Sequence, residues 1–157
     1  MKKLITILLM LVAISANGQW VPINGINGGK IYAILGTSTH IFVGTRGNLY
    51  SSSNNGLNWA NVGSGLQSCY VWSLANSGQN VYVGLYIGDG VYYTVDNGIN
   101  WIQMNNGLTN TNVRSLAFSG SNLYAGTSGG GVFLSTSGIG WTPFNNGLGN
   151  YNVVSLA

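Results

Sequence analysis

The stretch that decides the fold is Val91-Tyr-Tyr-Thr-Val-Asp-Asn-Gly-Ile-Asn-Trp101. Its first half is rich in β-branched and aromatic residues, which favour a β-strand. A short carboxylate such as Asp96 can accept N–H bonds from the turn that it begins, and Gly98 adopts backbone angles that other residues resist. The pattern Thr94-x-Asp96-x-Gly98-x-x-Trp101 therefore predicts a strand, a tight polar turn and the start of a returning strand.

This pattern occurs twice more, about 40 residues away on either side. The earlier copy has Asn in place of Asp, and the later copy is shorter by one residue. Their residues are Ser52, Asn54, Gly56 and Trp59 in the first copy, and Ser135, Ser137, Gly138 and Trp141 in the third. The spacing resembles the Asp box (S/T-x-D-x-G-x-x-W) of the bacterial neuraminidase repeat, which is found in sialidases, sortilin-type receptors and photosystem II assembly factors. This resemblance implies a β-propeller and a structural task for the box.

Two further landmarks repeat with the same period. A Gly-Leu turn recurs at 65–66, 107–108 and 147–148, and Ser-Leu-Ala recurs at 73–75, 115–117 and 155–157. A period of about 40–45 residues with short strands is typical of a propeller blade. We therefore predict an all-β fold, a β-propeller of four-stranded antiparallel blades. In the second repeat the strands are expected at Val71–Ala75, Asn80–Gly84, Val91–Val95 and from Trp101 onward.

The repeats divide the chain into segments. Trp20-Val-Pro-Ile-Asn24 matches Trp141-Thr-Pro-Phe-Asn145, which predicts a leading fourth strand that closes a ring. Known rings have about four to eight blades, so we expect an incomplete ring and the N-terminal part of a longer exported protein. In the alternative, the chain is complete and associates with copies of itself through open sheet edges. The expected segments are a signal peptide (1–18), the leading strand and linker (19–30), blade repeats at 31–70, 71–112 and 113–152, and the first strand of a further blade (153–157).

The N-terminus has the features of a secretory signal. Lys2 and Lys3 precede the apolar run Leu4–Ile14, and the small residues Ala16 and Gly18 follow it. The run of about 11 residues is shorter than the roughly 20 that a spanning helix needs. We expect a secreted or cell-surface protein with no membrane span after cleavage.

Composition excludes several classes of function. Only 4% of the residues are charged, and no cluster of Lys and Arg indicates nucleic-acid binding. The single cysteine, Cys69, has no partner for a disulfide within the chain. Zinc needs three or four ligands, so one His and one Cys predict no metal site, and no motif predicts a cofactor. Gly129-Gly130-Gly131 precedes a strand rather than a helix, which predicts a flexible connection and not a phosphate loop.

Antiparallel strands place alternate connections at opposite ends of a blade, and therefore on opposite faces of the propeller. The turns between strands one and two and between strands three and four, which include His40 and every box, share one face. The two–three and four–one connections share the other, where we expect any ligand because the resemblance to sialidases implies it. The candidate ligand-face residues are Lys30, Arg46, Tyr70, Tyr86, Asp89, Arg114 and Tyr151. In the alternative, the charges among them are solvated loop residues.

No catalytic set is expected. Glycoside hydrolysis needs two carboxylates beside the scissile bond, whereas the chain has no Glu and only two Asp. Asp96 belongs to a turn on the face opposite Asp89. The resemblance to sialidases implies an arginine cluster and a Tyr–Glu pair, which two arginines and no Glu do not provide.

Three hypotheses for function follow. The first is a secreted, non-catalytic propeller that binds a protein or a glycan. The second is the N-terminal fragment of a sialidase-like or other glycoside hydrolase whose catalytic residues lie in further blades. The third is a protein resembling the photosystem II assembly factors.

Overall fold

The computed structural model describes residues 25–157 except 28, 67–69 and 137. The predicted signal peptide, most of the predicted leading strand, Cys69 and Ser137 lie outside the described residues. The rest of the chain forms twelve β-strands. No helix in the described part of the chain is long and apolar enough to cross a membrane.

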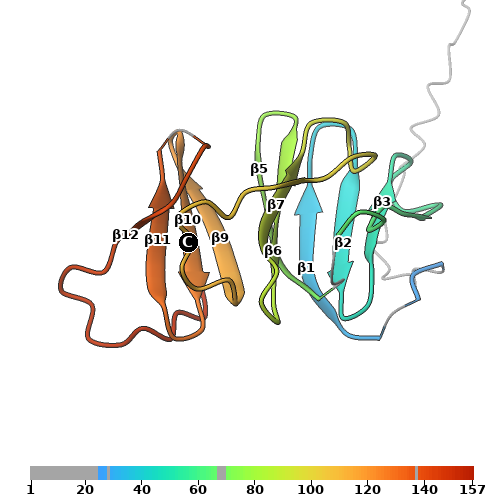
Figure 1. The fold of residues 1–157 in the computed structure, drawn as a ribbon. Coiled ribbons are helices and arrows are strands. Elements are labelled where there is room, and N and C mark those ends of the chain that lie inside the picture. The colour runs from blue at the N-terminus through green and yellow to red at the C-terminus, as the bar shows by residue number, and fades with distance from the viewer. Residues whose placement is uncertain (1–24, 28, 67–69, 137) are drawn as a thin grey trace, which may run out of the picture.

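The strands form three four-stranded antiparallel sheets, each in simple chain order (Figure 1). This arrangement confirms the prediction of an all-β fold with propeller blades. The first blade contains β1 (Ile31–Gly36), β2 (Ile41–Thr45), β3 (Leu49–Ser52) and β4 (Ala60–Asn61). The second contains β5 (Val71–Ser77), β6 (Asn80–Leu85), β7 (Gly90–Thr94) and β8 (Ile102–Gln103). The third contains β9 (Val113–Ser119), β10 (Asn122–Thr127), β11 (Gly131–Ser135) and β12 (Thr142–Pro143).

The strand boundaries of the second blade agree with the prediction to within two residues. The main difference is at the first hairpin, where β5 continues to Ser77 and pairs with Asn80. Gly78 has a φ of 59°, a conformation that glycine adopts without steric cost. The turn is therefore tighter than the four residues left between the predicted strands Val71–Ala75 and Asn80–Gly84, because one glycine allows the chain to reverse within two residues.

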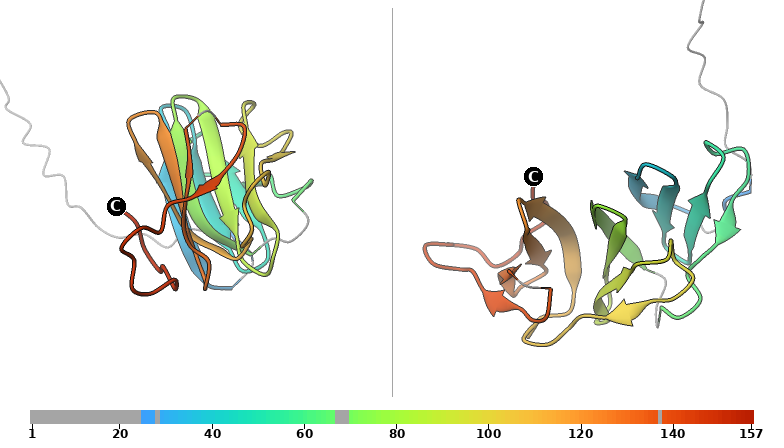
Figure 2. Two further views of the ribbon diagram at one scale, coloured as in Figure 1. Left: turned by 60° about the vertical axis from the view of Figure 1, so that its left-hand side comes forward. Right: turned by 90° about the horizontal axis from the view of Figure 1, so that it is seen from above.

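The three sheets stand side by side, and the first strands β1, β5 and β9 are neighbours (Figure 2). One apolar cluster joins Phe42 and Leu49 of the first blade to Val83 and Leu85 of the second. Another joins the second and third blades. The core of the protein therefore lies between blades, and the second blade contributes both faces of its sheet to it.

A glycine in each second strand permits close contact between blades. A Cβ atom on Gly84 would lie 2.6 Å from Val113 Cγ1, and one on Gly126 would lie 2.7 Å from Val153 Cγ1. Gly44 faces Val71 in the same way. The valine that begins each first strand thus packs onto the bare backbone of the preceding blade. Residues from Val153 onward dock on the third blade as a first strand docks on its predecessor.

Candidate ligand-binding site

The second box is a closed network of hydrogen bonds. The Thr94 hydroxyl donates to Asp96 Oδ1 at 2.7 Å, and the Asn100 backbone N–H donates to the same oxygen at 2.9 Å. The Gly98 N–H donates to Thr94 Oγ1 at 3.0 Å. The backbone N–H and then the side-chain amide of Asn100, followed by the Thr94 hydroxyl, lower the pKa of Asp96 to about 2. The carboxylate is therefore held ionised by the turn that it organises.

The other two boxes differ from this network. In the first, Ser52 donates to Asn54 Oδ1 at 3.0 Å and the Asn58 N–H donates to the same atom at 2.9 Å. A neutral amide oxygen thus replaces the carboxylate. In the third, Ser135 is 1% exposed and its hydroxyl has no hydrogen-bond partner. The shortened third turn does not engage this serine as the longer turns engage Ser52 and Thr94.

The box tryptophans connect neighbouring blades. Trp101 donates its indole N–H to the Val62 carbonyl at 2.7 Å, and Trp141 donates to the Met104 carbonyl at 2.7 Å. Trp59, in the first blade, donates instead to Gly56 of its own turn at 3.1 Å. Two of the three box tryptophans therefore hold successive fourth strands together.

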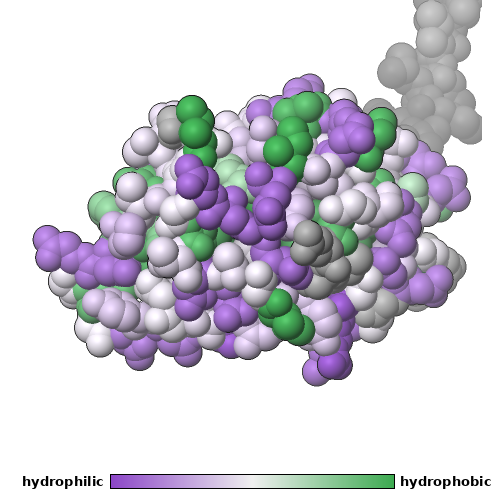
Figure 3. Space-filling model, viewed as in Figure 1, coloured by the Kyte–Doolittle hydropathy of each residue, from purple (hydrophilic) through white to green (hydrophobic). Residues whose placement is uncertain are grey.

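The surface on the box face is mixed rather than uniformly polar. Figure 3 shows hydrophobic residues as separate groups along the upper edge, surrounded by polar residues. The aliphatic residue that follows the box glycine is exposed in each copy, at Leu57, Ile99 and Ile139. Each blade therefore exposes one such aliphatic side chain at its box turn.

The opposite face carries a stack of aromatic and guanidinium groups. The Tyr32 and Trp72 rings lie 5.1 Å apart with 12° between their planes, and Trp72 and Tyr86 lie 4.6 Å apart at 26°. The Arg114 guanidinium lies 5.1 Å from the Trp72 ring centre and 5.6 Å from that of Tyr86. We call these four side chains the aromatic–arginine cluster. Three blades contribute to it, so it exists only in the folded ring segment.

The repeat explains why these residues meet. Tyr32, Trp72 and Arg114 each occupy the second position of a first strand, and β1, β5 and β9 are neighbours. Side chains at the same level of adjacent strands are brought together, and Tyr86 follows β6 at the same end of the blade. The prediction named Arg114 and Tyr86 but missed Tyr32 and Trp72. Alignment at the Ser-Leu-Ala segments places Trp72 at the position of Arg114, but the first repeat has Ala33-Ile34-Leu35 there, so Tyr32 is found only by aligning the first strands.

A second cation–π pair lies on the same face. The Arg46 guanidinium lies 5.3 Å from the centre of the Tyr70 ring, and Arg46 Nε donates a hydrogen bond to the Tyr70 hydroxyl. This hydrogen bond raises the pKa of the exposed Arg46. The structure thus brings together Arg46 with Tyr70, and Arg114 with Tyr86. Lys30 is exposed just before β1.

The remaining predicted residues have separate environments. Asp89 is half-buried, its carbonyl accepts the Asn105 side-chain N–H at 2.8 Å, and its Oδ2 atom is buried without a hydrogen-bond partner. Burial, and then the charge of Asp89, raises the pKa of Tyr92. Tyr151 is exposed, and its carbonyl accepts the Gly129 N–H at 3.0 Å and the Gly131 N–H at 2.8 Å.

The two aspartates lie beyond opposite ends of β7. At about 3.3 Å per residue along a strand, this places them roughly 20 Å apart. The carboxyl groups of most glycosidases lie about 5 to 9.5 Å apart. In the described residues no group of three or more His, Cys, Asp and Glu side chains could hold a metal ion.

The glycine-rich connection is closely packed. A Cβ atom on Gly131 would lie 2.2 Å from Asn145 Oδ1, and Gly131 has a φ of 80°. Asn145 accepts the Val132 N–H at 2.7 Å and donates to the Gly130 carbonyl at 3.1 Å. Asn105 makes the equivalent bonds in the second blade. The sequence predicted a flexible connection, but this close approach of an asparagine gives the glycines a packing role.

The fold is similar to that of several solved structures. The chain is 24% identical to an ancestral GH74 enzyme, with a TM-score of 0.56 over 78% of this chain and 20% of that one. It is 19% identical to the computationally designed Ika4 protein, with a TM-score of 0.66 over 89% and 86% of the two chains. It is 17% identical to YCF48 bound to a D1 peptide, with a TM-score of 0.60 over 78% and 42%.

These comparisons show a β-propeller fold. The chain spans a fifth of the length of the GH74 enzyme and less than half that of YCF48. No protein-family model matches the sequence, and no curated protein matches it.

Proposed function

We propose that the chain is a non-catalytic binding domain of an exported protein, and that its ligand contacts the aromatic–arginine cluster. The observation that carries this proposal is the convergence of Tyr32, Trp72 and Arg114 from three blades at one end of the inner strands. We infer further that the repeats are of the Asp-box type. The networks around Asp96 and Asn54 support a structural role for these boxes.

Unmet hydrogen-bonding capacity at the cluster supports a ligand there. Trp72 Nε1 and Arg114 Nε are buried and have no hydrogen-bond partner, and Asp89 Oδ2 on the same face has none. A buried donor without a partner costs about 1–3 kcal/mol. A ligand that accepts hydrogen bonds from Trp72 and Arg114 would recover this cost.

The composition of the cluster favours a protein partner over a glycan. Trp, Tyr and Arg are the residues that most often dominate the binding energy of protein interfaces. Arg46 and Arg114 would pair with an acidic residue or a terminal carboxylate on the partner. YCF48, which has a similar fold, is a peptide-bound structure, and this supports an extended segment as the ligand.

An enzymatic role is the second candidate, favoured by the likeness to the GH74 enzyme. It would require catalytic carboxylates outside this chain, because Asp89 and Asp96 lie beyond opposite ends of β7. A continuation of the reading frame beyond Ala157 with acidic residues on the cluster face would favour this candidate. The apolar N-terminal run supports export, and N-terminal sequencing of secreted protein should begin at Gln19.

The proposal is tested by selecting peptides from a random display library on the purified chain. Enriched peptides should carry acidic residues and bind at least tenfold more weakly to Arg114→Gln or Trp72→Ala, as expected for residues that dominate an interface. Trp72→Phe retains a stacking ring and should lose less affinity. Ile99→Ala, on the box face, is the matched control. Enriched peptides that bind all variants equally, or no enrichment at all, would refute the proposal.

A further inference from the structure

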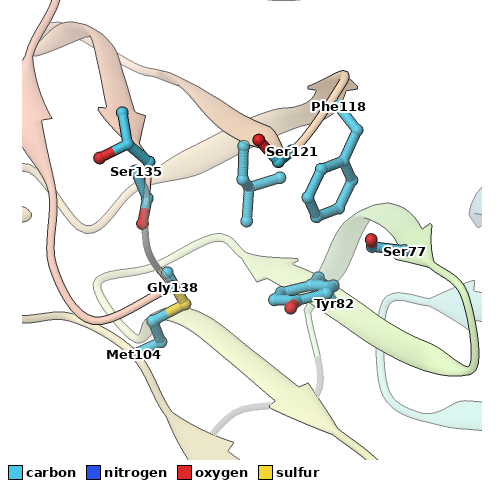
Figure 4. A pocket seen from close by; sticks show the side chains of 9 residues that line it. Ser77, Tyr82, Met104, Phe118, Ser121, Ser135 and Gly138 are labelled. Atoms are coloured by element: carbon cyan, nitrogen blue, oxygen red, sulfur yellow. The ribbon is translucent and has the colours of Figure 1, made fainter.

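A cavity lies between the second and third blades on the face that carries the box turns, opposite the aromatic–arginine cluster. Its volume is about 270 Å³. Pockets for drug-sized ligands usually measure about 300–1,000 Å³, so this cavity suits a smaller molecule. Figure 4 shows Tyr82 and Phe118 on one side of it, with Ser135, Gly138 and Met104 on the other.

Two aromatic rings form a right-angled corner in the cavity. The Tyr82 and Phe118 ring centres lie 5.2 Å apart with 68° between their planes. Tyr93 stacks on Tyr82 at 5.7 Å and holds it in place. A ligand ring in this corner would contact one aromatic face and one aromatic edge.

A buried hydroxyl lies in the same cavity. Ser135 is 1% exposed, lines the cavity, and its Oγ atom has no hydrogen-bond partner. Its counterpart Thr94 donates to Asp96 at 2.7 Å and accepts from Gly98 at 3.0 Å. The third box lacks this network, so the Ser135 hydroxyl has neither of the two bonds that Thr94 makes.

The polar lining of the cavity and its lack of charge indicate the class of ligand that would fit. Ser77, Ser121 and Thr136 also line the cavity, and no charged side chain is among the described residues that line it. A neutral ring with an apolar face and a hydroxyl edge matches this arrangement. A purely apolar ring would leave the Ser135 hydroxyl buried and unpaired, as it is without a ligand.

We propose that the cavity between blades two and three binds a single neutral sugar ring. The apolar face of the sugar contacts Tyr82 and Phe118, and one of its hydroxyls bonds to Ser135. This site is independent of the proposed function, because it lies on the opposite face and uses other residues. The two proposals can therefore fail separately.

The test uses saturation-transfer NMR and titration of the full chain with the methyl glycosides of glucose, galactose and mannose. At least one should bind, and Ser135→Ala should weaken it about two- to tenfold, the range expected for one hydrogen bond. Ser115→Ala is the matched control, because Ser115 also has a buried, unpaired hydroxyl but does not line the cavity. Phe118→Ala should abolish binding while circular dichroism shows that the fold is retained.

Three results would overturn the proposal. They are binding of none of the glycosides, equal binding to wild type and Ser135→Ala, or binding of phenol in preference to every sugar. The last result would identify an apolar aromatic ligand, such as a partner's side chain. If Phe118→Ala fails to fold, the Ser135→Ala and Ser115→Ala pair still decides the outcome.

Discussion

Replacement of Trp141 by Phe should show how much the inter-blade hydrogen bond contributes to the free energy of unfolding, separately from the box turn. Trp141 is 4% exposed, and its indole N–H bonds to the Met104 carbonyl of the preceding blade at 2.7 Å. The loss of the donor leaves a buried carbonyl unpaired, at about 1–3 kcal/mol. The smaller ring leaves a void worth about 1 kcal/mol more. Trp141→Phe should therefore lower the free energy of unfolding by about 2–4 kcal/mol.

Trp59→Phe is the matched control, since Trp59 is half-buried and bonds within its own turn at 3.1 Å. Trp59→Phe should lower the free energy of unfolding by about 1 kcal/mol or less. Thermal unfolding followed by circular dichroism gives the comparison, with a shift of about 2–4 °C per kcal/mol for a chain of this length. Equal destabilisation by the two substitutions would refute the argument that the tryptophan connects the blades.

Three further predictions concern the turns and blade contacts. Gly84→Ala should destabilise the fold by about 1–3 kcal/mol, because the new Cβ would lie 2.6 Å from Val113 Cγ1. Gly36→Ala is the control and should not destabilise the fold, because nothing lies within 4 Å of a Cβ at that position. Equal urea midpoints for the two variants would contradict this prediction. Asn145→Ala should cost about 1–3 kcal/mol through its two lost backbone partners, whereas Asn146→Ala on the exposed neighbour should stay within about 0.5 kcal/mol in the same assay. The folded-state pKa of Asp96 is lowered to about 2, so its contribution to stability is present above the unfolded-state pKa near 4 and is lost as the pH falls through 2. Asp96→Asn should remove this part of the acid dependence, with Asp89→Asn as control, and an unchanged acid-unfolding profile would contradict the assignment.

Part of the site could be predicted from the repeats, and part could not. Antiparallel strand order alone places Arg114 and Tyr86 at one end of the blades. It does not show that Trp72 lies between them and Tyr32, because stacking depends on the distance between first strands of different blades. The cavity beside Ser135 also escaped prediction, since the sequence shows a shortened turn but not that the serine loses its partners.

By itself, the sequence determined the period, the strand order and the position of each box turn. These features follow from local chemistry: alternating apolar residues, glycines that permit reversals, and short side chains that bond to their own turns. Only the tertiary structure decided which residues of different repeats meet. The Gly84–Val113 contact, the Trp141–Met104 bond and the aromatic–arginine cluster all join separate blades. Their geometry depends on how closely the sheets pack, which no single repeat encodes.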